Sequence, residues 1–239
     1  KQGIKDLTAI DVVIANPGVP RDHPVLEVAK KRGITIANIG SLFFATQDQT
    51  VIGVTGTRGK STTVQLITAL LKANGNRVAS VGQPGVSLLD SAGRKKDILV
   101  AELSSWQLEG LVIPKRGPTI AVVTNFSADH LNRYRSLRHY ASAKQNILRF
   151  QTKSDYAVLP YDDAAIRAWS RLTPATVLYF STKRLPPRGI GVRQGWFVER
   201  RAGRVRRLVR ISTLPEQNDH SLSNVAAALA AVMPYNVAP

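Results

Sequence analysis

The sequence predicts an α/β protein built on a mostly parallel, doubly wound sheet of the phosphate-loop type. Short apolar runs rich in β-branched residues alternate with helix-length segments along the chain, which is the pattern of βαβ units. The run Val51–Val54 leads directly into a glycine-rich turn and a Lys-Ser pair that opens a helix. Two later apolar runs also end in polar loops, and ligands bind at the carboxyl ends of parallel strands.

The composition is that of a globular protein, with 44% hydrophobic and 21% charged residues among 239. No apolar run approaches the roughly 20 residues of a membrane-spanning helix, so no membrane span is expected. The absence of cysteine excludes disulfides and cysteine-ligated zinc, and it agrees with the cytoplasmic location that we expect. Because the chain opens almost directly into a strand, we expect it to be a piece of a longer protein.

The net charge of +17 is unevenly distributed. Between Lys183 and Arg210 there are ten Lys or Arg residues and one acid, Glu199. Trp196 and Phe197 are the only aromatic residues of this segment, and it matches no DNA- or RNA-binding motif. We interpret it as a solvated basic hairpin, with attraction to anionic substrates as the second interpretation. A nucleic-acid-binding ATPase is the alternative from a different class, and nucleic acid is not the expected partner.

The first elements are two short strands separated by a helix. Ala9–Ala15 is predicted as a strand, closed by a turn that contains Gly18. Asp22 is predicted to cap the amino end of the helix, and Gly33 to cap its carboxyl end. Ile34–Ala37 is the second strand. Such a β–α–β fragment cannot bury its own apolar faces, so it needs a neighbouring domain.

Two domains are therefore predicted. Residues 1–47 are interpreted as the C-terminal part of an N-terminal Rossmann-like domain, and residues 48–239 as the central, nucleotide-binding domain. Gln47–Thr50 is expected to connect the two.

The second domain continues the alternation of strands and helices. The segment with Gly189, Gly191, Gly195 and Gly203 is predicted to be a small, basic antiparallel hairpin. Strands are predicted over residues 51–54, 78–81, 98–103, 119–124, 156–159 and 177–180. Helices are predicted over residues 61–74 and 137–150, and from about Ser221 through Val225–Met233.

The stretch from Thr55 to Thr62 has the layout of a phosphate-binding loop. Backbone N–H groups and a helix N-terminus are expected to bind the phosphates, Lys60 to contact the terminal ones, and the hydroxyl of Ser61 or Thr62 to hold Mg²⁺. Val54 stands where the strict pattern G-x-x-x-x-G-K-[ST] has its first glycine. The residues predicted to bind the nucleotide are Gly56, Thr57, Gly59, Lys60, Ser61 and Thr62.

Two further strand ends carry candidate metal ligands. Glu102 closes one strand, and Asn125, Asp129 and His130 follow the next. One hydroxyl and one carboxylate suffice as protein ligands of Mg²⁺, because the ion keeps several waters and phosphate oxygens. His130 could bind a second cation, and two cations would then neutralise a phosphoryl group in transfer.

Three motifs together resemble the Mur ligases of peptidoglycan synthesis: TGTRGKST, ELSSWQLE and NFSADHLNRY. That family also lacks the first glycine of the strict loop pattern, so Val54 agrees with it. The resemblance runs from about Asp11 to the end of the chain. Within the family it is closest to the ligases that add D-glutamate to UDP-N-acetylmuramoyl-L-alanine.

The resemblance implies an enzyme with a UDP-binding domain, a central ATPase domain and a third, Rossmann-like domain. ATP would phosphorylate the carboxylate of the UDP-linked muramoyl-alanine substrate to an acyl phosphate, and the amine of D-glutamate would displace phosphate. Such an enzyme is expected to be cytoplasmic and monomeric. We expect this chain to be inactive alone, because in the family the third domain closes over the nucleotide.

The resemblance also assigns roles to single residues. Lys60, His130 and Lys144 would be catalytic, with Lys144, in YASAK, carbamylated and bridging to the metal site. Asn224 would contact adenine. The metal ligands would be Ser61, Thr62, Glu102, His130 and Lys144, and the substrate contacts Gly18, Gln83, Ser104 and His130.

Departures from the family pattern leave alternatives within the superfamily. Arg58 replaces the usual asparagine of the loop, and poly-γ-glutamate synthases share that arginine. Gln83 and Ser221 stand where the family has asparagines. A folylpolyglutamate or poly-γ-glutamate synthase is therefore the alternative, against which ELSSWQLE and the Asn16-Pro17-Gly18 loop argue.

Overall fold

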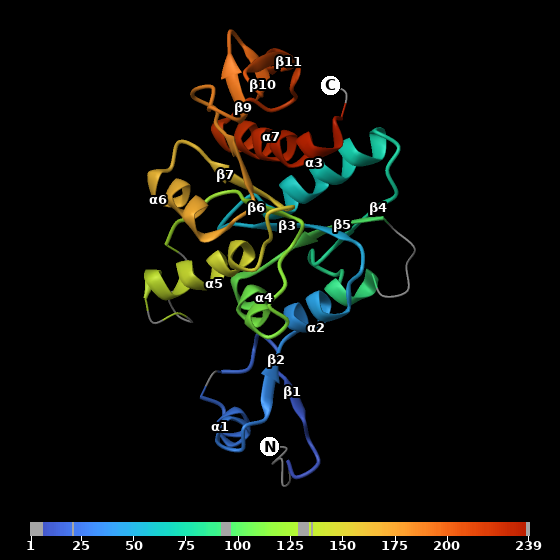
Figure 1. The fold of residues 1–239 in the computed structure, drawn as a ribbon, viewed down its shortest axis with the longest axis vertical. Coiled ribbons are helices and arrows are strands. Elements are labelled where there is room, and N and C mark those ends of the chain that lie inside the picture. Colours follow the sequence, from blue (N-terminus) through green and yellow to red (C-terminus); the bar gives the residue numbers. More distant parts are fainter. Residues whose placement is uncertain (1–6, 21, 92–96, 129–133, 135, 238–239) are drawn as a thin grey trace.

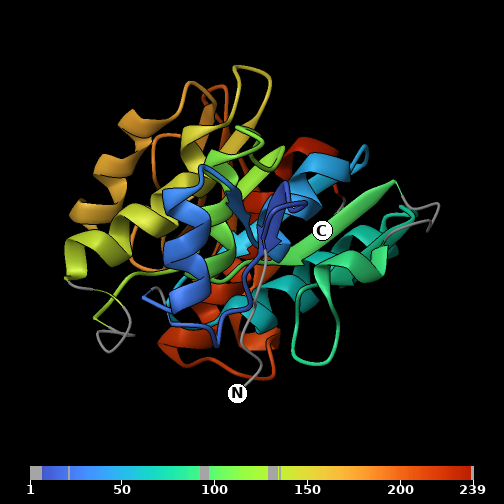
Figure 2. The same cartoon turned by 90° about the horizontal axis from the view of Figure 1, so that it is seen from below.

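A computed structural model describes residues 7–20, 22–91, 97–128, 134 and 136–237. The described chain forms a small two-stranded sheet near its beginning and a nine-stranded sheet in the remainder. The two lie along the long axis of the molecule, with the small sheet at one end (Figure 1). A view along that axis shows the small unit in front of the middle of the larger body (Figure 2). Within the described residues, no helix has the length and apolarity needed to span a membrane.

The small unit consists of β1 (Val12–Ile14), α1 (Pro24–Lys31) and β2 (Thr35–Ala37), with the strands parallel. The predicted cap at Asp22 is wrong. His23 is the N-cap of α1, and its Nδ1 accepts a hydrogen bond from the backbone N–H of Val25 at 3.3 Å. At the other end Arg32 is the C-cap, and Gly33 follows it with a φ of +71°. Proline at the first helical position fixes where the helix starts.

The large sheet is parallel over seven strands and antiparallel at one edge. Its spatial order is β11-β10-β9-β8-β7-β6-β3-β5-β4. The strands are β3 (Thr50–Thr55), β4 (Val78–Val81), β5 (Ile98–Glu102), β6 (Ile120–Val123), β7 (Tyr156–Pro160), β8 (Thr176–Phe180), β9 (Gly189–Arg193), β10 (Trp196–Arg201) and β11 (Arg204–Arg210).

Helices cover both faces of this sheet, as the doubly wound prediction requires (Figure 1). On one face α3 (Lys60–Ala73) packs against the alanine-rich α7 (Asp219–Val232), and both bury side chains of β3 such as Ile52 and Val54. On the other face α2 (Ile39–Thr46), α4 (Ser105–Glu109), α5 (Leu137–Arg149) and α6 (Ala164–Arg167) cover Val51 and its neighbours. Short 3-10 turns lie at Leu88–Ser91, Gly110–Val112, Ala168–Leu172, Ile211–Thr213 and Met233–Tyr235.

The antiparallel pairing predicted for the basic segment is confirmed, because β10 pairs antiparallel with both β9 and β11. The segment forms three strands, and β9 pairs in parallel with β8, so that β9–β11 extend the main sheet. Gly195 and Gly203 turn the chain between these strands with φ values of +74° and +76°. We call β9–β11 the basic meander.

The sequence did not predict α2, which is apolar on most of its surface and lacks a clear helical period. Asn38 and Ser41 form its capping box, and both side chains are buried. The Asn38 amide also donates to the carbonyl of Trp106, at 2.7 Å, which ties the start of α2 to α4. This helix therefore packs on the larger body, and the boundary between residues 47 and 48 stays a prediction.

Candidate active site

The phosphate loop joins β3 to α3 and depends on two glycines. Gly59 is the N-cap of α3 with a φ of +77°, and a Cβ there would lie 2.2 Å from the side-chain oxygen of Asn224. Gly56 has a φ of +157°, and a Cβ there would lie 1.9 Å from the hydroxyl oxygen of Thr124. Since neither position has room for a side chain, the loop keeps a bare backbone beside the start of the helix, as close approach of a phosphate requires.

The end of β6 holds the loop in this conformation. The Asn125 side chain accepts from the Arg58 N–H and donates to the Arg58 carbonyl, both at 2.9 Å. The Thr124 hydroxyl donates to the same carbonyl at 2.7 Å. These bonds use only the backbone of Arg58, so the replacement of the family's asparagine by arginine leaves the support of the loop intact. The sequence placed Asn125 at this edge but did not reveal that it fixes the loop.

Two lysine ammonium groups converge on the loop. Lys60 donates to the carbonyls of Gly56 and Thr57, at 3.2 and 3.1 Å. Lys144, on α5, donates to the same Gly56 carbonyl at 2.9 Å and is only 2% exposed. Its ammonium also lies 4.8 Å from the centre of the Tyr140 ring. Two positive charges this close to one carbonyl favour an anion beside the loop.

A hydroxyl and a carboxylate lie next to the loop. Ser61, in the first turn of α3, donates to Glu102 Oε2 at 2.6 Å, and Glu102 is the last residue of β5. Thr62 is exposed on the same turn. Asp129 and His130 lie outside the described residues, so the second metal site remains a prediction. Within the described part of the chain no three His, Asp or Glu side chains group to form a metal site.

Two of the predicted substrate contacts, Gln83 and Ser104, lie in segments next to Glu102. A Cβ on Gly82 would lie 2.3 Å from the Glu102 carbonyl, so the turn that carries Gln83 packs against the end of β5. Ser104 is the N-cap of α4, where its hydroxyl accepts from the Gln107 N–H at 3.3 Å. Ser104 thus has a structural partner in addition to any contact with a ligand.

Asn224 lies where the first turns of α3 and α7 meet. Its Oδ1 accepts from the Thr63 hydroxyl at 3.5 Å, and the same atom faces Gly59. Nearby, a cavity of about 460 Å³ opens at the carboxyl ends of β6, β7 and β8 and the start of α7. Its lining includes the polar side chains of Asn125, Asp162, Asp163, Ser181, Lys183 and His220.

Asp162 and Ser181, which also line this cavity, were not predicted from the sequence. The Ser181 hydroxyl donates to Asp162 Oδ2 at 2.6 Å, and Arg184 Nε donates to Oδ1 at 3.2 Å. Ser181 directly follows β8 and Asp162 follows β7 by two residues. Their positions at strand ends were the available signal, the same one that identified Glu102.

A second cavity, of about 290 Å³, separates the small unit from the larger body. Gly18 belongs to the turn after β1, where its N–H donates to the Asn16 side chain at 3.0 Å. The residue after it, Val19, lines this cavity. The other side chains that line it include Leu26, Lys30, Ile36, Trp106 and Ile113.

These features define a class: an α/β domain that binds a nucleotide at the carboxyl edge of a parallel sheet. The chain belongs to the Mur ligase family, because the Mur ligase middle domain matches residues 54–232. That span includes the phosphate loop after Val54, the Ser61–Glu102 pair and Lys144. The fold and the family therefore agree with the prediction made from three short motifs.

Curated relatives are similar over nearly the whole chain. The UDP-N-acetylmuramoylalanine--D-glutamate ligase of Alkaliphilus oremlandii (strain OhILAs) is 34% identical over 237 residues, which is 98% of this chain and 52% of that protein. The protein of the same name from Desulfitobacterium hafniense (strain Y51) is 35% identical over 226 residues, 94% of this chain and 49% of that protein. The chain thus spans about half the length of the curated relatives it matches.

Solved structures share the fold. The UDP-N-acetylmuramate:L-alanyl-gamma-D-glutamyl-meso-diaminopimelate ligase from Neisseria meningitides matches with a TM-score of 0.67 at 17% identity, over 95% of this chain and 75% of that one. The MurF ligase from Thermotoga maritima, solved in complex with ADP, matches with a TM-score of 0.60 at 20% identity, over 95% of this chain and 60% of that one. At these identities the likeness concerns the fold alone.

Proposed function

We propose that the full-length protein is an ATP-dependent ligase that joins UDP-N-acetylmuramoyl-L-alanine to D-glutamate by an amide bond. The observation that carries this proposal is the convergence of Lys60, Lys144 and the Ser61–Glu102 pair at one sheet edge. The names of relatives at 34% and 35% identity support the choice of substrates. We further propose that the protein acts as a monomer in the cytoplasm, in the synthesis of peptidoglycan precursors.

The residues present fit ATP and Mg²⁺. Gly56 and Gly59 leave the loop backbone open to phosphates, and Lys60 supplies a charge that can move from the loop carbonyls to a phosphate. Ser61 and Glu102 present two hard oxygen atoms 2.6 Å apart, the ligand type that Mg²⁺ prefers. When bound, MgATP supplies the phosphoryl group and neutralises charge during its transfer.

The chemistry has two steps in this proposal. A carboxylate oxygen of the substrate attacks the terminal phosphorus and the bond to ADP breaks, which gives an acyl phosphate. The amine of D-glutamate then attacks the carbonyl carbon, loses a proton and expels phosphate. Lys60 acts mainly through its positive charge, which stabilises the oxygens on which negative charge develops.

Lys144 is proposed to act in its carbamylated form. Lys144 is 2% exposed and its ammonium donates to the Gly56 carbonyl, so the side chain lies at the site rather than on the helix surface. Addition of CO₂ to its neutral amine would turn this positive group into a carboxylate that can bind a cation. The Gly18 turn and the 290 Å³ cavity beside it are proposed to hold the UDP part of the substrate, with Gln83 and Ser104 nearer the reacting end.

A direct assay tests the proposal. The full-length protein, with Mg²⁺ and ATP, should release phosphate only when both the UDP-linked substrate and D-glutamate are present, and L-glutamate serves as the control. Release that requires folate or a polyglutamate acceptor instead would favour another ligase of the superfamily. Folded protein that releases no phosphate above background with both substrates would refute the proposal.

A further inference from the structure

The basic meander lies at the opposite end of the molecule from the β1–α1–β2 unit (Figure 1). The proposed ligase reaction assigns no role to the seven basic residues of β9–β11. All seven are arginine, whose planar fork suits phosphate groups.

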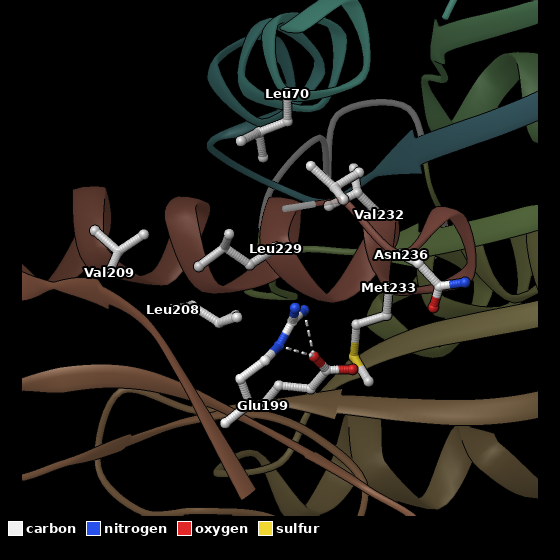
Figure 3. Close-up of a pocket in the computed structure, with 10 residues that line it drawn as sticks. Leu70, Glu199, Leu208, Val209, Leu229, Val232, Met233 and Asn236 are labelled. Carbon is white, nitrogen blue, oxygen red and sulfur yellow. Dashed lines mark hydrogen bonds and ion pairs between the residues drawn. The ribbon is translucent and has the colours of Figure 1, made fainter. Parts of the chain in front are cut away.

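Two arginines on the face toward α7, Arg201 and Arg206, bond to other residues of the protein. Arg206 forms an ion pair with Glu199 at 2.9 Å, in an apolar pocket formed with Met233 of the chain's C-terminal turn (Figure 3). Arg201 donates to Asn236 Oδ1 at 2.6 Å and to the Met233 carbonyl at 3.3 Å. The Arg201 bonds fasten the meander to the turn that follows α7, and Glu199 balances the charge of Arg206.

The opposite face carries its own set of arginines. Trp196 pairs with Arg193 on β9 and with Arg210 on β11, and directly paired residues of antiparallel strands point to the same side. Arg207 reaches the same side, because its guanidinium lies 5.5 Å from the centre of the Trp196 ring. Arg193, Arg207 and Arg210 are all exposed. We call Trp196, Arg193, Arg207 and Arg210 together the outer arginine face.

No carboxylate balances this face within the meander. Glu199 is the only acid in β9–β11, which the structure describes throughout, and it points toward α7. The segment Arg184–Pro186 covers part of this side, over Gly191, the strand partner of Val198. The three exposed arginines are spread over the rest of it, on β9 and β11, and this arrangement matches an anionic surface better than a single small ligand.

We propose that the outer arginine face binds the phosphate headgroups of an anionic phospholipid membrane surface. Arginines and a tryptophan are the side chains that favour the interface between water and lipid. Single-stranded nucleic acid is the weaker fit, because it needs a row of open aromatic rings. The outer arginine face has one aromatic ring, that of Trp196, and the guanidinium of Arg207 lies over it.

Vesicle binding by the full-length protein tests this proposal, which does not depend on the ligase reaction. The probes are vesicles of phosphatidylglycerol and phosphatidylcholine in a 3:7 ratio, with pure phosphatidylcholine as control. The protein should bind only the anionic vesicles at about 0.1 M salt and leave them at about 0.5 M, because salt screens exposed charges. Each arginine near the surface contributes roughly a fivefold gain in affinity.

The triple variant R193Q/R207Q/R210Q should therefore bind about a hundredfold more weakly. The matched control K72Q/K153Q/R171Q removes the same charge from exposed residues elsewhere and should bind within about twofold of wild type. Thermal melts check that both variants fold, and R193K/R207K/R210K should keep most of the affinity.

Three results would overturn the proposal. One is that wild type does not bind anionic vesicles at low salt, which would leave the arginines the role of protecting the exposed β11 edge. Another is that the two charge-removing triple variants lose affinity equally, since net charge alone would then explain binding. The third is that single- or double-stranded DNA binds more tightly at the same salt and displaces the vesicles.

Discussion

The phosphate-loop edge and the basic meander both contain left-handed glycines and positive charges, but these have different roles in the two regions. Both contain glycines with nearly equal backbone angles, +77° at Gly59 and +76° at Gly203. At Gly59 an added Cβ would lie 2.2 Å from Asn224, whereas at Gly203 nothing lies within 4 Å. The first glycine is needed for space as well as for its backbone angle, and the second for the angle alone. Crowding therefore distinguishes a glycine at a binding site from one in a turn.

The positive charges of the two regions differ in the same way. Lys144 is 2% exposed and fixed on a loop carbonyl, so its charge acts at one point. Arg207, on the meander, is exposed and rests on Trp196. Buried charge of the first kind suits catalysis, where preorganised groups act without solvent screening. Exposed charge of the second kind is weakened by salt and suits surface recognition.

The largest effect is expected for Lys60→Ala. Removal of this charge should lower kcat/KM about a thousandfold, because a fixed donor to the transferring group is lost. The control is Lys72→Ala, at an exposed position near the other end of the same helix, which should leave kcat/KM within about twofold. Steady-state kinetics on the full-length protein measure both. Equal losses in the two variants would contradict the assignment of Lys60.

Lys144→Ala is expected to lower activity about a hundredfold. If a carbamate on Lys144 is the active group, bicarbonate should not restore the variant, whereas a short carboxylic acid such as acetate should restore part of the activity. The readout is phosphate release across an acetate titration. Full activity of the variant without any addition would remove Lys144 from the site.

The two glycines test the role of crowding. Gly203→Ala should cost about 1 kcal/mol of folding stability, the cost of a left-handed backbone angle alone. Gly59→Ala should cost roughly 1–3 kcal/mol more, because Asn224 must move, and it should also weaken ATP binding. Urea unfolding gives the first quantity and calorimetric titration of ATP the second. Equal costs at both positions would show that Asn224 shifts freely.

The smallest effect concerns pH. Burial raises the pKa of Tyr235, in the turn after α7, to about 12 from its usual 10. The neutral ring is favoured in the fold, so this contribution to stability is complete below about pH 10 and is lost as the pH rises toward 12. Tyr235→Phe should reduce the fall in the free energy of unfolding over that range. If the free energy of unfolding falls equally in the variant and the wild type, groups other than Tyr235 cause the fall.

Much of the fold could be predicted because the central strands are short, apolar and bounded by turns. The limits of β4 were predicted to the residue, and those of β3, β7 and β8 within one. Helix α2 was not predicted, because its apolar residues surround the helix and give no stripe of period 3.6. The pairing of β9 with β8 was not predicted, because strand partners are set by tertiary contacts that the local sequence does not show.

The phosphate loop of the candidate site could be predicted from the sequence, but the residues that hold the loop in place could be predicted only in part. Lys60, Ser61 and Glu102 follow from strand-end positions. From local pattern alone Lys144 would be taken for an exposed helical lysine, and only the family resemblance marked it before the structure showed it buried. Asn125 carries no sequence signal for its role, because it acts through the backbone of a loop 67 residues away in sequence.

An isotopic label tests directly whether the phosphate-loop edge makes an acyl phosphate. Both oxygens of the alanine carboxylate in the UDP-linked substrate are labelled with ¹⁸O, and the released phosphate is analysed by mass spectrometry after a reaction with ATP and D-glutamate. We expect one ¹⁸O atom in each phosphate released, because the attacking carboxylate oxygen leaves with the phosphorus. Unlabelled phosphate, released while amide product forms, would contradict it.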